Sequence, residues 1–195
     1  MEICFATNNE HKLAEVQQML PETITLKTLA QVGCTEDVPE TQNTLEGNAR
    51  QKAQYIFEKY EINCFADDTG LEVYSLNNEP GVYSARYAGE QRNNLDNINL
   101  LLQNLENKAD RKARFLTVIA LVLDGEYFLF EGVVEGEIIK EMRGDNGFGY
   151  DSVFVPEGSD KTFAEMTAQE KNLISHRYRA ITALITYLRN KFDVL

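Results

Sequence analysis

The sequence predicts an α/β fold with a mixed β-sheet, and three observations lead to this prediction. Strand-like and helical segments alternate early in the chain, a long hairpin follows in the middle, and helices close it. The chain has 195 residues, of which 43% are hydrophobic and 26% are charged. Because this size suffices for a core without disulfides or structural metal, we expect one domain over residues 1–195.

The first half of the chain contains two expected strands and two expected helices. Residues 3–7 form an apolar strand, and a polar turn leads from it into a helix over residues 13–20. Residues 23–29 alternate like a second strand, and Thr44 is a suitable cap for a helix that continues to residue 60. A strand that enters a helix through a polar turn directs backbone N–H groups at that turn, which favours an anion site there.

Two adjacent carboxylates, Asp67 and Asp68, stand at the end of the next apolar strand. Successive side chains of a strand point to opposite faces, so we expect one of the two carboxylates to face a ligand and the other to brace the turn. Thr69 and Gly70 favour a turn, which predicts a hairpin into residues 71–76. The local chemistry leaves two interpretations, a polar hairpin turn or a Mg²⁺ site, since Mg²⁺ is often bound by one or two carboxylates with substrate phosphates.

The clearest β signal of the chain is the long hairpin. Residues 114–123 are rich in β-branched and apolar side chains, a two-residue Asp-Gly turn follows, and residues 127–139 return. Gly132 and Gly136 are expected to introduce bulges or bends into the returning strand. A helix over residues 93–105 precedes the hairpin.

The last part of the chain is expected to contain two helices. A glycine-dense loop over residues 143–151 leads to extended segments at 152–155 and 162–166. A Thr-Ala-Gln-Glu capping box then begins the helix that carries Lys171, and Ser175 caps the final helix.

Three basic side chains have both a bland and a functional interpretation. His176 and Arg177 lie in the first turn of the final helix, where positive charge opposes the helix dipole. They either face an anionic or carbonyl ligand or belong to an exposed turn without a role. Lys52 lies at the edge of an apolar helix face, which by itself is typical of a solvated lysine.

Charge and cysteine content limit the possible partners. The formal net charge of −12 argues against electrostatic binding to nucleic acid or to an anionic membrane. Neither an export signal nor an apolar stretch of membrane-spanning length is present in the sequence, so we expect a cytoplasmic protein. Cys4, Cys34 and Cys64 lack metal-ligand spacing and are predicted to be buried thiols.

Four segments carry side chains suited to chemistry, at residues 7–12, 67–69, 148–151 and 171–177. Loops at strand ends are where α/β proteins place their ligand sites. Together these segments offer carboxylates for a metal, lysines and backbone amides for phosphates, an aromatic ring for a flat base, and donors for a carbonyl group. A nucleoside phosphate bound with a metal accounts for all four.

Five segments, in this order, resemble the signatures of the inosine triphosphate pyrophosphatase family, whose members are also called dITP/XTP pyrophosphatases. They are FATNNEHK at 5–12, ADDTGLEV at 66–73, PGVYSARYAG at 80–89, GFGYD at 147–151 and SHR at 175–177. The resemblance implies an elongated mixed sheet flanked by helices, with two lobes and a central cleft. It also implies Mg²⁺-dependent hydrolysis of ITP, dITP and XTP to the monophosphate and pyrophosphate, by a homodimer.

The same resemblance implies roles for individual residues. Asp68 is the expected general base and metal ligand, with Thr69 beside the substrate and Glu40 as the second metal carboxylate. Many members have a glutamate where this chain has Gly47, and Glu46 is an alternative to Glu40. The expected contacts to the phosphates are Thr7, Asn8, Asn9, Glu10, His11, Lys12 and Lys52. The expected contacts to the base are Phe148, Gly149, Tyr150, Asp151, Lys171, His176 and Arg177.

Two other functions stay open at this point. One is a nucleotide pyrophosphatase of the related Maf type, which would act on pyrimidine or modified triphosphates. The other is a nucleotide-binding module without catalysis, against which the presence of Asp68 and Lys12 argues. An assay of pyrophosphate release over a panel of triphosphates separates these functions.

Overall fold

The computed structural model describes residues 1–192, without the side chains of His11, Glu15 and Gln18. The described chain divides into two compact units. Unit 1 contains residues 1–68, residues 118–131 and the described residues from 179 onward, and unit 2 contains residues 69–117 and 132–178. The prediction of one domain over residues 1–195 stays a prediction.

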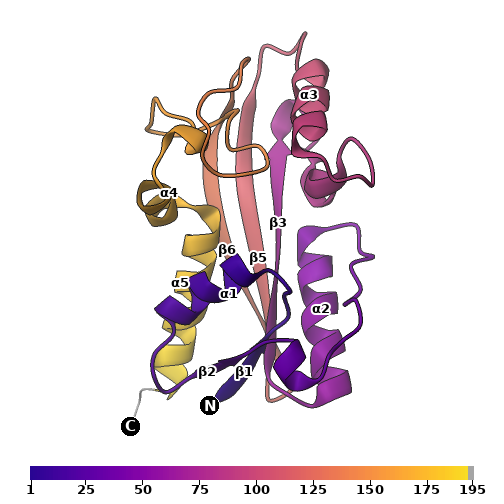
Figure 1. Ribbon diagram of the computed structural model, residues 1–195, viewed down its shortest axis with the longest axis vertical. Helices are drawn as coiled ribbons and strands as arrows, with labels where there is room; N and C mark the ends of the chain where they lie inside the picture. The colour runs from indigo at the N-terminus through magenta and orange to yellow at the C-terminus, as the bar shows by residue number, and fades with distance from the viewer. Residues whose placement is uncertain (193–195) are drawn as a thin grey trace. The chain divides into compact units, whose positions relative to one another are not determined.

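Within the described residues, seven strands form one mixed sheet (Figure 1). Its order is β2-β1-β3-β5-β6-β7, and β4 pairs with β3. Strand β1 pairs in parallel with β2 and β3, whereas β3–β4 and β6–β7 are antiparallel, so the predicted α/β class with a mixed sheet is confirmed. The strands are β1 (Glu2–Phe5), β2 (Thr25–Lys27), β3 (Cys64–Val73), β4 (Glu79–Pro80), β5 (Lys112–Leu123), β6 (Glu126–Ile138) and β7 (Phe154–Pro156).

The predicted helices are present, and local sequence explains where they begin. Thr44 accepts a hydrogen bond from the Gly47 N–H, and Thr167 forms the predicted capping box with Glu170. Ser175 Oγ accepts from the Tyr178 N–H at 3.1 Å. The helices are α1 (Glu10–Met19), α2 (Leu45–Tyr60), α3 (Asn94–Asn104), α4 (Ala168–Ile174) and α5 (His176–Phe192).

Each unit has a hydrophobic core of its own. In unit 1, Val16 of α1 and the apolar face of α5, from Ala180 to Leu188, pack with Phe65 and the buried residues of β1 and β5. Figure 1 shows α2 and α5 on opposite sides of these strands. In unit 2, Ile98 and neighbouring side chains of α3 join a cluster that includes Phe115, Phe154 and Phe163. Burial of apolar area of this kind supplies most of the stability of a fold.

The predicted turn after Asp68 is wrong. Strand β3 runs without interruption from Cys64 to Val73 and pairs with β1 at its start and with β4 at its end. Thr69 and Gly70 favour turns as isolated residues, but pairing at both ends of the strand outweighs that preference. The two carboxylates therefore lie in the middle of a strand, where neighbouring elements can reach both faces.

Two further expectations differ from the structure. Residues 163–165 form a short 3₁₀ helix instead of an extended segment, because Thr162 and Glu165 make a second capping box. Gly136 lies in a regular part of β6. A Cβ atom there would lie 2.3 Å from the Val155 carbonyl oxygen, so close approach of β7, and not a bulge, accounts for this glycine.

The hairpin and the cysteines agree with the predictions. Asp124 and Gly125 both have positive φ angles, of 52° and 82°, as a two-residue hairpin turn requires. Cys4, Cys34 and Cys64 are free and buried. No helix among residues 1–192 combines the length and apolar character needed to cross a membrane.

Candidate active site

In unit 1, a buried carboxylate on β3 lies between two lysines from different helices. Lys12 Nζ, in the first turn of α1, donates to Asp67 Oδ2 at 2.7 Å, and the Asp67 side chain is only 3% exposed. Lys52 Nζ, from the middle of α2, donates to the Asp67 carbonyl oxygen at 2.7 Å and to a carboxylate oxygen of Glu40. Asp67 therefore holds positive charge in place and does not brace a turn.

Asp68 has different surroundings, as the alternation of a strand predicts. It is half-buried, and its Oδ2 accepts a hydrogen bond from Asn48 Nδ2 at 3.0 Å. A neutral donor orients a carboxylate without neutralising its charge. Asp68 thus receives a hydrogen bond from an amide, and it also contributes to the negative charge around Lys52.

The interpretation of Lys52 as a solvated lysine is wrong, since its side chain is buried. Burial by itself would lower the pKa of the Lys52 ammonium, but the carboxylates of Asp67, Asp68 and Glu40 outweigh this effect and raise the pKa above its usual value. Lys52 is therefore a permanent cation inside a cluster of negative charge. The sequence did not show this, because its partners lie in separate segments of the chain.

The segment that carries Glu40 is tied to α2 by side-chain hydrogen bonds. Gln51 Oε1 accepts from the Thr41 N–H at 2.8 Å, and Gln51 Nε2 donates to Thr41 Oγ1 at 2.8 Å. Asn48 Oδ1 accepts from the Gln42 N–H at 2.9 Å. Glu40 is therefore delivered to the cluster by a segment with defined anchors.

Glu46, the alternative second carboxylate, is placed elsewhere. Its Oε1 accepts from Arg50 Nε at 2.8 Å on an exposed part of α2. A Cβ atom at Gly47 would lie 2.7 Å from Gln42 Cβ, so the segment before α2 packs against the helix start where many members have a glutamate. The structure thus brings Glu40, and not Glu46, to the carboxylate and lysine cluster.

The donor set around Asp68 fits a hard divalent cation such as Mg²⁺. Asp68 and Glu40 supply carboxylate oxygens, and Glu40 has a side-chain exposure of 40%. Among the described side chains, which exclude those of His11 and Glu15, no group of three or more His, Cys, Asp and Glu residues is arranged to hold a metal. A cation held by these two carboxylates would complete its shell with substrate oxygens and water, as is usual for Mg²⁺.

The predicted phosphate segment of unit 1 is a turn organised by its own side chains. Thr7 Oγ1 accepts from the Asn9 N–H at 3.2 Å, and Asn9 Oδ1 accepts from the Lys12 N–H at 3.2 Å at the start of α1. Asn8 and Glu10 are exposed. The side chain of His11 lies outside the described part of the molecule.

In unit 2, the predicted base-binding residues gather around one buried ion pair. Lys171 Nζ lies 2.6 Å from Asp151 Oδ2, and the Asp151 side chain is 5% exposed. The same oxygen accepts from the Phe148 N–H at 2.8 Å. Lys171 Nζ lies 5.0 Å from the centre of the Phe148 ring, which is 63% exposed. This fixed backbone and exposed ring are suited to stacking against a flat ligand.

Three more of the predicted base contacts have distinct positions. The Tyr150 side chain lies in the core, where its hydroxyl donates to the Ser84 carbonyl oxygen at 2.8 Å, so only its backbone could meet a ligand. His176 is buried and stacks on Phe115 with ring centres 4.8 Å apart. Arg177 and Gly149 are half-buried. The interpretation of the first turn of α5 as wholly exposed is therefore wrong.

Thr69, the next residue after Asp68, belongs to unit 2. Its hydroxyl lies 2.8 Å from the hydroxyl of Thr117, which is completely buried in β5. In the sequence, Thr117 stands out only as a polar interruption of an apolar strand. Its partner on β3 explains why a hydroxyl is tolerated there.

A comparison with models of known protein families identifies the family of this chain. A model of the Ham1 family matches residues 3–187. The chain belongs to the Ham1 family. All five signature segments lie within the matched residues, so the resemblance seen in the sequence is confirmed.

Several proteins of known name or structure are similar to this Ham1 chain. A dITP/XTP pyrophosphatase of Flavobacterium johnsoniae is 55% identical over 188 residues, which cover 96% of this chain and 98% of that protein. The structure of a Ham1 protein from Staphylococcus aureus has a TM-score of 0.93 at 40% identity, over 98% of this chain and 100% of that chain. A dITP/XTP pyrophosphatase structure from Mycobacterium abscessus has a TM-score of 0.83 at 42% identity, over 95% and 99% of the two chains.

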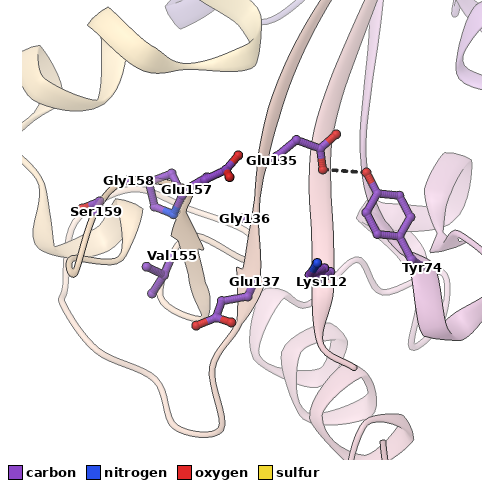
Figure 2. Close-up of a pocket in the computed structure, with 10 residues that line it drawn as sticks. Tyr74, Lys112, Glu135, Gly136, Glu137, Val155, Glu157, Gly158 and Ser159 are labelled. Atoms are coloured by element: carbon purple, nitrogen blue, oxygen red, sulfur yellow. Dashed lines mark hydrogen bonds between the residues drawn. The ribbon is translucent and has the colours of Figure 1, made fainter. Parts of the chain in front are cut away.

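This Ham1 chain also has a pocket in unit 2, lined by residues of β5, β6 and β7 and by neighbouring residues. The pocket has a volume of about 480 Å³. Figure 2 shows Tyr74 from beyond β3, Lys112 of β5 and Glu157 after β7 on its walls, with Tyr74 bonded to Glu135. None of the predicted site residues lines it. The pocket therefore supplies positions for control substitutions.

A further cluster in unit 1 fixes the start of the segment that leads to Glu40. The Glu36 carboxylate accepts from Tyr60 Oη at 2.7 Å and from Tyr55 Oη at 2.9 Å, and it pairs with Lys59. The hydrogen bond from Lys59, followed by that from Tyr60, lowers the pKa of Glu36 well below its usual range.

This cluster predicts an acid-sensitive contribution to stability. Because the folded-state pKa of Glu36 lies below the unfolded value of about 4.3, the contribution is complete above that value and is lost as the pH falls below it. We expect the free energy of unfolding of Glu36→Gln to change less between pH 7 and pH 3.5 than that of the wild type, as measured with urea. Glu46→Gln, which removes an exposed pair, is the control. Equal pH dependence of the wild type and Glu36→Gln would contradict the prediction.

Proposed function

We propose that this chain is a nucleoside triphosphate pyrophosphatase that hydrolyses non-standard purine nucleoside triphosphates, such as dITP, ITP and XTP, to the monophosphate and pyrophosphate. The observation that carries the proposal is the cluster on β3, in which Asp68 follows Asp67, the partner of the half-buried Lys12, and Asp67 and Glu40 both bond to the buried Lys52. The full-length similarity to proteins named dITP/XTP pyrophosphatase supports the choice of substrate. Removal of such triphosphates would cleanse the nucleotide pool.

In this proposal, the residues of unit 1 handle the triphosphate. Asp68, held by the Asn48 amide, would orient or deprotonate the attacking water. Lys12, Lys52 and the turn at residues 7–12 would contact the phosphates. Asp68 and Glu40 would hold Mg²⁺, which would supply charge neutralisation for the leaving pyrophosphate.

The residues of unit 2 would recognise the base. The exposed Phe148 ring would stack on the purine, with its backbone fixed by Asp151 and Lys171. Arg177, His176 and backbone donors of residues 149–151 would face the 6-oxo group. Adenine presents a hydrogen-bond donor at that position, so the donors of the protein would be left without an acceptor. Thr69 would lie beside the substrate.

The remaining expectations concern the setting of the enzyme. A homodimer and a cytoplasmic location are proposals that rest on the resemblance and on the sequence. The net charge of −12 supports a protein without nucleic-acid or membrane partners.

A panel of triphosphates tests the proposed function. We expect kcat/KM for ITP, dITP and XTP to exceed that for ATP by roughly 5- to 140-fold for each buried donor left unpaired, since such a group costs about 1–3 kcal/mol. Pyrophosphate is the expected first product, measured with and without Mg²⁺. Equal rates for ATP and ITP would contradict the role of Arg177, and preference for pyrimidines would favour the Maf-type alternative. Orthophosphate as the first product would indicate a phosphatase.

A further inference from the structure

One buried amide in unit 1 connects a carboxylate of the candidate site to the segment that carries Glu40. Asn48 is 3% exposed and lies on the face of α2 that also carries Ala49, Lys52 and Ala53. Its Oδ1 accepts from the Gln42 N–H at 2.9 Å, and its Nδ2 donates to Asp68 Oδ2 at 3.0 Å. The partners fix which end of the amide points where, because a backbone N–H only donates and a carboxylate accepts.

Asn48 connects β3 to the segment before α2, as Lys52 does one helical turn later. Lys52 joins β3, through the Asp67 carbonyl oxygen, to Glu40, and Asn48 joins β3, through the Asp68 carboxylate, to the Gln42 N–H. Residues four apart lie on the same helix face, so one rigid helix sets both connections. Both connections link the strand to the same short segment of the chain.

We propose that Asn48 is a positioning residue that fixes the orientation of the Asp68 carboxylate and couples it to the segment carrying Glu40. The proposal rests on the function above, in which Asp68 acts on water. The charged groups near this carboxylate include Lys52 on α2, Asp67 on β3, Glu40 before α2, and Lys12 of α1 through its pair with Asp67. Asn48 adds a donor among them without adding charge.

Burial alone does not account for an asparagine at this position. A leucine, with the same number of side-chain heavy atoms, would occupy a buried helix position without the cost of burying an amide. What leucine cannot supply is a donor to the carboxylate and an acceptor for the Gln42 N–H. The amide therefore supplies the one acceptor and the one donor that its two partners need, and substitutions can remove these bonds separately.

Three substitutions separate orientation of Asp68 from anchoring of the segment. Asn48→Leu removes both bonds, whereas Asn48→Asp keeps an acceptor for Gln42 and loses the donor to Asp68. Gln51→Leu is the matched control, because Gln51 anchors the same segment to the same helix through Thr41 and has no bond to Asp68.

The experiment measures kcat and KM for ITP, binding of a non-hydrolysable α,β-imido analogue by calorimetry, Tm, and the crystal structures of the variants. We expect kcat to fall about 10- to 100-fold in both Asn48 variants, since small misplacements of catalytic groups have effects of this size. KM and analogue affinity for Asn48→Leu and for Gln51→Leu should stay within about 3-fold of the wild type, far less than the change in kcat. Gln51→Leu should also keep its kcat. In crystals of Asn48→Leu, the Asp68 carboxylate should be rotated.

Three results would overturn the inference. They are an unrotated Asp68 carboxylate in Asn48→Leu, a kcat for that variant equal to the wild-type value, or an equal loss of kcat in Gln51→Leu. If the wild-type protein releases no pyrophosphate from any triphosphate, the proposed function fails and this inference fails with it. The crystallographic result distinguishes that case, since it reports the orientation of Asp68 without reference to activity.

Discussion

Asp68→Asn is expected to lower kcat for ITP by about 10²- to 10⁴-fold, the usual contribution of a positioned general base. The amide has the shape of the carboxylate, and its oxygen can still accept from Asn48 Nδ2. The substitution removes the negative charge that would activate water and contact Mg²⁺. It leaves the Lys12–Asp67 pair and the Lys52 bond to the Asp67 carbonyl oxygen in place.

The fold of Asp68→Asn should survive. Asp68 is half-buried among other carboxylates, so neutralising it removes repulsion as well as attraction. We expect the free energy of unfolding to change by less than about 1 kcal/mol. Pyrophosphate release measures kcat, and circular dichroism with urea measures the fold. Glu157→Gln, on the wall of the pocket in Figure 2, is the control and should keep wild-type activity. Turnover near the wild-type rate in Asp68→Asn would remove Asp68 as the base.

Lys171→Met should have the largest effect on stability. It leaves the Asp151 carboxylate, 5% exposed, without the cation that lies 2.6 Å away. Breaking a buried pair by removing one partner typically costs about 3–5 kcal/mol, and we expect the lower end because the Phe148 N–H still donates to the same oxygen. Urea unfolding measures this loss.

A double variant and a surface variant make this second prediction specific. Adding Asp151→Asn to Lys171→Met removes the unpaired charge and should recover more than half of the lost stability. Lys161→Met breaks an exposed ion pair, in which the side chain of Lys161 is 53% exposed and that of Glu170 is 51% exposed. This substitution should lower the free energy of unfolding by less than about 1 kcal/mol. If Lys171→Met costs no more than Lys161→Met, the ion pair does not stabilise unit 2.

The helix starts could be predicted from sequence because their causes are local. Thr44, Thr167 and Ser175 each bond to a backbone N–H three residues ahead, so a short stretch of sequence contains the whole interaction. The Asp-Gly hairpin turn is local in the same way. The apolar repeats predicted α2 and α5 because packing selects one face of each helix.

The surroundings of the candidate site could not be predicted in this way. The burial of Lys52 depends on carboxylates from β3 and from the segment before α2, which only the fold brings together. The turn expected at Thr69 is absent because β3 pairs with β1 at its start and with β4 at its end. Asn48 carried one signal, because it is a polar residue among the apolar residues that mark the buried face of α2. That pattern indicates a buried polar contact, but it does not identify the residue that Asn48 contacts.

The anchoring of residues 41 and 42 bears on how this region opens. Their backbone N–H groups are bonded to side chains of α2, whereas the N–H groups of a free loop face water. They can exchange with solvent only when Gln51 and Asn48 release them. A segment without helix or strand structure thus shares the cooperative opening of the helix beside it. In the sequence this segment only connects two elements, but its backbone N–H groups become exposed to solvent together with those of α2.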